Sequence, residues 1–104
     1  MKKYKNFTVD IMGRKTKVYF INSDKIKSPP LYSKNDEAIG TFTLSNQEIF
    51  LNSNINFDSI KSTFLHEIIE SVNYLCELNL PHEKITTLET GIYSAIQKKW
   101  NPFN

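Results

Sequence analysis

One histidine and two glutamates lie close together within residues 62–73, and their types and spacing could support metal chemistry. His66 and Glu70 are four residues apart, so on a helix their side chains leave from the same face and can reach one ion. Imidazole nitrogen and carboxylate oxygen both bind Zn²⁺ at about 2.0–2.2 Å, and three protein ligands leave a fourth position for water. Glu67, next to the first ligand, could take a proton from that water. The segment therefore predicts a metal site with hydrolytic potential.

A third protein ligand must come from another element, and the candidates lie in a predicted second helix. The face of that helix toward the first is predicted from Ile85, Leu88, Ile92 and Ile96. At about 100° per residue, His82 and Glu89 lie roughly 60–80° from the centre of this face, whereas Glu83 points almost away. His82 is therefore the preferred ligand, with Glu83 or Glu89 as substitutes. In an antiparallel pair, His82 reaches His66 and Glu70 only with a strong crossing angle or a longer loop path.

Three further residues have candidate roles. Asn73, seven residues after His66, lies on the same face and could orient a ligand. Tyr93 lies on the side of the second helix that carries the candidate ligands, where a phenol could stabilise an oxyanion. Cys76 falls on the apolar stripe of the first helix, which predicts a buried side chain.

The cluster also allows a purely structural interpretation. His66 could be a core histidine, and Glu67 and Glu70 could belong to a solvated helix face. The surrounding pattern favours metal binding over this alternative.

Hydrophobic periodicity places these residues on two helices. From Asn56, a candidate N-cap, apolar residues recur every three or four positions, which predicts a helix of roughly twenty residues that stops at 79–80. They are Ile60, Phe64, Leu65, Ile68, Val72, Leu75 and Cys76. Pro81 suits the start of a second helix, where its missing N–H costs nothing. Pro102 ends that element after Trp100.

The first half of the chain alternates apolar and polar residues, as strands do. Residues 7–11 and 15–21 predict a β-hairpin with a tight turn at 12–14. Residues 41–44 and 48–51 predict a second hairpin, and the proline-containing segment 27–36 predicts a surface loop. The expected fold class is α+β, with a small, twisted, mainly antiparallel sheet of about four N-terminal strands packed on two C-terminal helices.

Length and composition predict one domain over residues 1–104, because 104 residues are too few for two cores. No segment suggests a membrane span or a signal peptide, and a single cysteine fits the reducing cytoplasm. The net charge is +2, yet the first 34 residues carry nine basic and two acidic side chains. Because these basic residues alternate with apolar ones, we interpret them as a solvated face, and nucleic-acid binding is the weaker hypothesis.

Five segments carry a resemblance to a known family: IGT (39–41), EIFLN (48–52), TFLHEIIESVN (63–73), LNLPHE (78–83) and LETGI (88–92). Together they resemble the short zinc-metallopeptidase-like proteins of bacteriophages and integrated elements, which are minimal zincins. In that family a His-Glu-x-x-His helix follows the strands, and an early glutamate of the second helix is the third ligand. Here Glu70 stands in place of the second histidine and His82 in place of that glutamate, which keeps two histidines and one carboxylate.

The resemblance implies a cytoplasmic protein of phage type, which in an infected cell acts in the host cytoplasm. It implies Zn²⁺ bound by His66, Glu70 and His82, and hydrolysis of a peptide bond with Glu67 as general base. The expected substrate is a polypeptide that lies in extended form beside the strand at 48–52 and pairs with it through main-chain hydrogen bonds.

An alternative from another functional class keeps the fold without the hydrolysis. It is an inactive zincin-fold module that binds or blocks a host protein. In that case a fourth protein ligand, Glu83 or Glu89, should close the metal site, because structural zinc sites leave no open position.

Overall fold

A computed structural model describes residues 4–21, 40–43 and 47–103 of the chain. The predicted loop at 27–36 and residues 44–46 of the second predicted hairpin lie outside this part. Strands come first and helices follow: β1 (Phe7–Ile11), β2 (Arg14–Ile21), β3 (Gly40–Thr43), β4 (Glu48–Asn52), α1 (Phe57–Leu75) and α2 (His82–Ile96). The predicted α+β class is confirmed.

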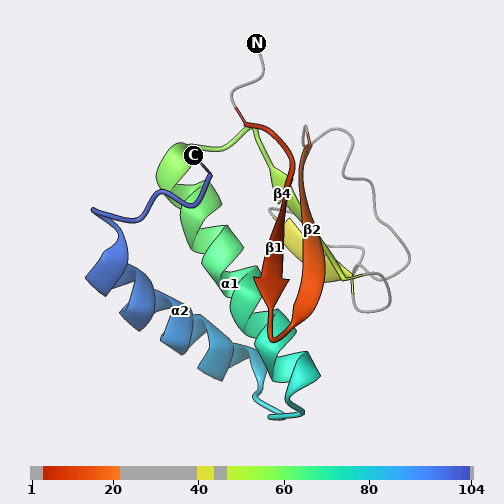
Figure 1. Cartoon of the computed structure of the whole chain (residues 1–104). Helices are drawn as coiled ribbons and strands as arrows, with labels where there is room; N and C mark the ends of the chain where they lie inside the picture. Colours follow the sequence, from red (N-terminus) through yellow and green to blue (C-terminus); the bar gives the residue numbers. More distant parts are fainter. Residues whose placement is uncertain (1–3, 22–39, 44–46, 104) are drawn as a thin grey trace.

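The described strands form one sheet in the order β1-β2-β4-β3 (Figure 1). β1 and β2 pair antiparallel across a two-residue turn, as the first predicted hairpin requires. Met12 and Gly13 both have positive φ, 54° and 82°, which matches the right-handed twist of a tight hairpin and suits a glycine. The turn is fastened by Asp10, whose Oδ1 accepts a hydrogen bond from the Gly13 N–H at 2.8 Å.

β4 lies inside the sheet, between β2 and β3. It pairs antiparallel with β3, as expected of the second hairpin, and parallel with β2, where Val18 is opposite Ile49. Because both edges of β4 are already hydrogen-bonded, a substrate strand cannot add to residues 48–52, and that prediction is wrong. Among the described strands, β3 has β4 as its one neighbour.

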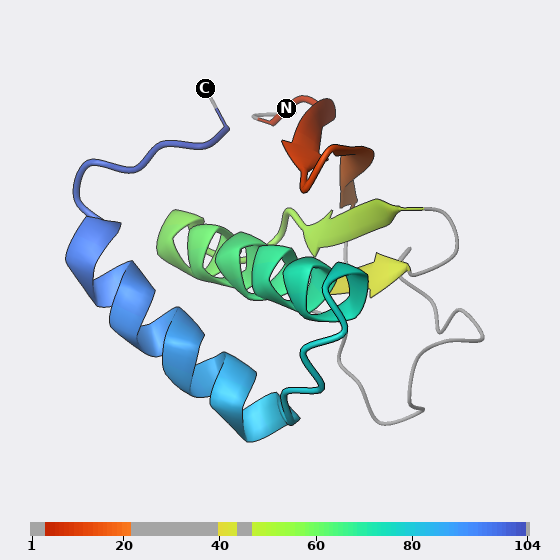
Figure 2. The ribbon, with the colours of Figure 1, turned by 60° about the horizontal axis from the view of Figure 1, so that its bottom comes forward.

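The molecule has three layers, with α1 between the sheet and α2 (Figures 1 and 2). α1 packs on the sheet through an apolar core, whose buried members are Ile11, Val18, Phe20, Ile49, Leu51, Ile60 and Phe64. α2 packs mainly against the other side of α1. The described part of the chain contains no helix that is both long and apolar enough to cross a membrane.

α1 begins as predicted, because the Asn56 side chain accepts a hydrogen bond from the Ser59 N–H at 2.8 Å. It ends at Leu75, several residues before the predicted stop at 79–80. Cys76 caps this end and is exposed, so its predicted burial is wrong.

α2 turns a different face toward α1 than its apolar residues predict. Ile85 is buried, but Leu88 and Ile92 are 43% and 40% exposed. Glu89 and Tyr93 instead contact α1. The predicted apolar face is therefore wrong over the middle of the helix, because polar partners on α1 set the rotation of α2.

The C-terminal tail fastens the end of α2 to the rest of the fold. α2 ends at Ile96, and the chain then returns to the first turns of α1 (Figure 1). There Trp100 stacks on Phe64, and Phe103 packs edge-on against Phe20 with ring centroids 5.0 Å apart. The buried Lys61 ammonium donates to the carbonyl oxygens of Gln97 and Trp100, at 2.8 and 2.9 Å.

Candidate metal centre

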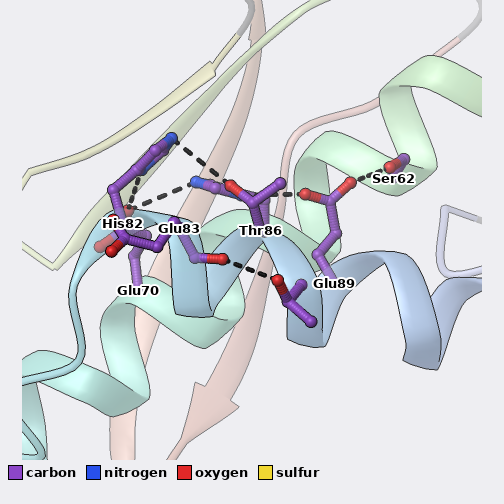
Figure 3. Close-up of polar contacts among 8 residues, drawn as sticks. Ser62, Glu70, His82, Glu83, Thr86 and Glu89 are labelled. Carbon is purple, nitrogen blue, oxygen red and sulfur yellow. Dashed lines mark hydrogen bonds and ion pairs between the residues drawn. The ribbon is translucent and has the colours of Figure 1, made fainter.

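The three predicted metal ligands meet between α1 and α2. His66 Nε2 lies 3.3 Å from Glu70 Oε2, and His82 Nδ1 lies 3.7 Å from the same oxygen. One donor atom from each residue falls within 4.8 Å of the other two. Figure 3 shows Glu70 and His82 facing each other across the two helices. The residues that sequence spacing and the resemblance selected are thus neighbours in space.

Asn73 explains how His82 reaches back to this position. Its side-chain oxygen accepts from the Leu80 N–H at 2.9 Å, and its amide nitrogen donates to the Leu80 carbonyl at 3.2 Å. Glu77 and Asn79 have positive φ, which lets the connection fold back along the last turn of α1. α2 therefore starts beside Glu70. Asn73 was predicted to orient a metal ligand. Its side chain instead binds the Leu80 backbone and so positions the start of α2.

Two of the three donor separations are close to those around a tetrahedral metal ion. Donors at about 2.0–2.2 Å from such an ion are separated by about 3.3–3.6 Å, close to both distances from Glu70 Oε2. Two imidazoles and one carboxylate are a donor set that Zn²⁺ accepts. A network of ion pairs without metal would have the same contacts. A measurement of metal binding therefore distinguishes the two.

Glu89 contacts the other nitrogen of the His66 ring. Its Oε1 lies 3.0 Å from His66 Nδ1, and its Oε2 accepts a hydrogen bond from Ser62 (Figure 3). Glu89 is thus placed to hold a ligand rather than to replace His82. Glu83, the other predicted substitute, is exposed and outside the grouped donors. Sequence analysis missed Ser62, although its spacing of four from His66 places both on one face of α1.

His66 and His82 differ in their surroundings. The His66 side chain is 16% exposed and has a carboxylate at each ring nitrogen. The His82 side chain is 74% exposed, and its Nε2 lies 3.5 Å from the Thr86 hydroxyl. The site therefore has one mostly buried imidazole on α1, with both nitrogens in contact with carboxylates, and one exposed imidazole at the start of α2.

Glu67 is buried next to the ligands, with 7% of its surface exposed, so the solvated-face interpretation is wrong for this residue. Burial raises the pKa of its carboxyl to about 8, and the negative charges of Glu70 and Glu89 add to this increase. Within the described residues, no hydrogen bond engages the Glu67 carboxyl group. In the metal-free protein the folded state thus favours the protonated form.

Tyr93 does not take part in the site. Its hydroxyl donates to the Asp58 carbonyl at 3.2 Å and to Asp58 Oδ1 at 3.1 Å, near the start of α1. Partial burial, this hydrogen bond and the Asp58 charge raise the pKa of Tyr93 to about 12. The predicted oxyanion role is not supported, because the hydroxyl is already engaged at the opposite end of the helix pair from His82.

Comparisons with known proteins add no relative to these observations. No protein-family model, curated protein or solved structure matches the chain.

Proposed function

We propose that the chain is a zinc-dependent metallopeptidase-like hydrolase with a minimal zincin fold. His66, Glu70 and His82 would hold the ion, as the resemblance implies. The observation that supports this most strongly is the grouping of one donor atom each from His66, Glu70 and His82 within 4.8 Å, with both distances from Glu70 near those around a tetrahedral ion. The cytoplasm of a phage-infected cell remains the proposed setting.

In this proposal Glu67 is the general base. Bound zinc would supply a Lewis acid that activates water and polarises a substrate carbonyl. Glu67 directly follows a proposed ligand in the chain and is shielded from bulk solvent. The protonated form that burial favours without metal cannot act as a base, but a nearby dication would lower the pKa of Glu67 and favour the carboxylate that accepts the proton. Its free carboxyl oxygens among the described contacts support this assignment.

The substrate in this proposal is an extended polypeptide. β3 has one neighbour among the described strands, and α1, which carries His66 and Glu70, packs against β3. A polypeptide added to β3 through main-chain hydrogen bonds would therefore run along the helix that carries the site. This replaces β4 as the proposed docking strand.

The alternative, an inactive module that binds a host protein, requires a closed structural site. Glu89 is engaged by His66 Nδ1 and Ser62, and Glu83 is not among the grouped donors. Neither supplies a fourth ligand in this arrangement. The open position favours the hydrolase proposal.

Metal content is the first test. The purified chain, saturated with Zn²⁺ and dialysed, should retain about one ion per molecule by elemental analysis. His66→Ala and Glu70→Ala should retain little zinc, whereas Glu83→Ala, a nearby exposed glutamate, should match the unchanged chain. A substoichiometric metal content in the unchanged chain would contradict the proposal.

Hydrolysis is the second test. Glu67→Gln should keep its zinc but cleave an unfolded protein such as reduced casein about 10²–10⁴ times more slowly, because the general base is lost. Removing the zinc with a chelator should abolish cleavage, and added Zn²⁺ should restore it. A zinc-loaded chain that cleaves no unfolded protein would favour the inactive module instead.

A further inference from the structure

The two nitrogens of the His66 ring have different neighbours. Nε2 lies 3.3 Å from Glu70 Oε2, and the same oxygen contacts His82, the third proposed ligand. Nδ1 faces Glu89 Oε1 at 3.0 Å, on the opposite side of the ring. The side chains of His66 and Glu89 are only 16% and 17% exposed, so water competes weakly for this contact.

The closer of two carboxylates decides which ring nitrogen of a neutral His66 carries the proton. An ionised carboxylate can only accept hydrogen bonds, so Glu89 favours an N–H at Nδ1 and Glu70 favours one at Nε2. Glu89 is nearer, at 3.0 Å against 3.3 Å, and its side chain is 17% exposed against 32% for Glu70, so the contact with Glu89 prevails. In a neutral imidazole the lone pair is then on Nε2, the nitrogen that faces Glu70. Ser62 donates to the second oxygen of Glu89 and so fixes the plane of the carboxylate.

We propose that Glu89, oriented by Ser62, is a positioning residue that keeps the proton of His66 on Nδ1 and reserves Nε2 for the metal. This inference rests on the proposed zinc site and adds residues that neither spacing nor the resemblance assigned to this role. Ser62 and His66 lie one turn apart on α1, and Glu89 comes from α2. The two helices thus jointly define the tautomer of the ligand.

His82 provides an internal comparison. Its second nitrogen lies 3.5 Å from the Thr86 hydroxyl, a long contact on an exposed part of α2. A hydroxyl can donate or accept, so Thr86 imposes no tautomer on His82. The inference therefore predicts a large effect of removing the Glu89 charge and a small effect of removing the Thr86 hydroxyl.

Zinc affinity, measured by competition with a chromophoric chelator, tests the role of Glu89. Glu89→Gln should bind zinc 10–100 times more weakly, the usual effect of losing such a partner. Ser62→Ala should weaken binding by less than tenfold. Glu83→Gln removes the same charge from an exposed position on the same helix and should stay within twofold, as should Thr86→Val. An unchanged affinity in Glu89→Gln would overturn the inference.

The position of the ring proton gives a measurement that general destabilisation would not change. Long-range ¹H–¹⁵N spectra of the metal-free chain, at a pH where the imidazole is neutral, should show the His66 proton on Nδ1. His82→Gln assigns the signals, since the chain has two histidines. In Glu89→Gln the amide can donate to Nδ1 or accept from it, and Glu70 at Nε2 is the one carboxylate left on the ring, so the proton should move to Nε2. A proton on Nε2 in the unchanged chain would overturn the inference.

The two tests also separate this inference from the proposed function. If the unchanged chain binds no zinc, both are overturned. If it binds zinc with equal affinity before and after Glu89→Gln, the inference alone fails and the zinc site remains.

Discussion

α1 has two covered sides whose chemistry differs. Toward the sheet, Ile60 and Phe64 pack among apolar side chains with almost no exposed surface. Toward α2, where Ile85 is also buried, α1 makes several polar contacts, and most of them join ionisable groups. They are Asp58 with Tyr93, Ser62 with Glu89, His66 with Glu89, and Glu70 with His82.

The second helix is also held at both of its ends. Asn73 fixes the chain at Leu80, before α2 begins. Beyond its last turn, Trp100 stacks on Phe64 in the aromatic core. Because these end contacts help to hold α2 against α1, the middle of the interface can carry ionisable groups. The side of α1 that faces the sheet therefore stabilises the fold, and the side that faces α2 holds the proposed metal ligands.

The largest predicted effect is on stability: shortening a side chain between α1 and the sheet should destabilise the protein much more than shortening one on α2. Ile60→Ala in α1 should lower the free energy of unfolding by about 2–5 kcal/mol, because Ile60 is fully buried against the sheet. Ile92→Ala in α2 changes the same residue type in a helix, but Ile92 is 40% exposed and should cost less than about 1 kcal/mol. Urea unfolding of the metal-free proteins, followed by circular dichroism, measures both. Equal losses would contradict the distinction.

The pH dependence of stability should report on Glu67. The folded state raises the pKa of Glu67 from 4.5 to about 8, so between these values the folded protein holds a proton that the unfolded chain has released. The free energy of unfolding of the metal-free protein should therefore fall as pH rises from about 4.5 to about 8. The expected loss is on the order of 1–4 kcal/mol.

Glu67→Gln removes this titration and provides the comparison for that experiment. Near pH 5 its stability should be close to that of the unchanged chain, and near pH 9 it should be more stable. Glu83→Gln, which changes an exposed glutamate of α2, should follow the unchanged chain at every pH. Parallel curves for Glu67→Gln and the unchanged chain would show that burial does not control this carboxyl.

Local signals in the sequence predicted most of the fold. The Asn56 cap and the glycine in the turn after β1 fix their elements through contacts within a few residues. The parallel pairing of β2 with β4 could not be predicted in this way, because it joins strands separated by residues 22–47. Alternation of apolar and polar residues shows that a strand exists and not which strand lies beside it.

The candidate site was predictable to a similar extent. The spacing of four between His66 and Glu70 places both on one face of any helix, and helical angles together with the resemblance selected His82. The contact of Glu89 with His66 Nδ1 depends on the rotation of α2, which apolar periodicity predicted incorrectly. Periodicity assumes that apolar residues set a helix interface, and here hydrogen bonds between ionisable groups do so.

The smallest predicted effect concerns Tyr93, at the end of the helix pair away from the proposed ligands. Tyr93→Phe removes a hydrogen bond to Asp58 and should lower the free energy of unfolding by about 0.5–1 kcal/mol, because the bond is exposed to water. Asp58→Asn should cause a similar loss, and the double variant should lose less than the sum, since both changes remove one contact. Zinc affinity should stay within twofold in all three, unlike in Glu89→Gln. A large loss of zinc affinity or hydrolysis in Tyr93→Phe, with stability retained, would contradict this expectation. It would show that the hydroxyl leaves Asp58 to act in the metal site, so that the two ends of the α1–α2 interface do not have separate roles.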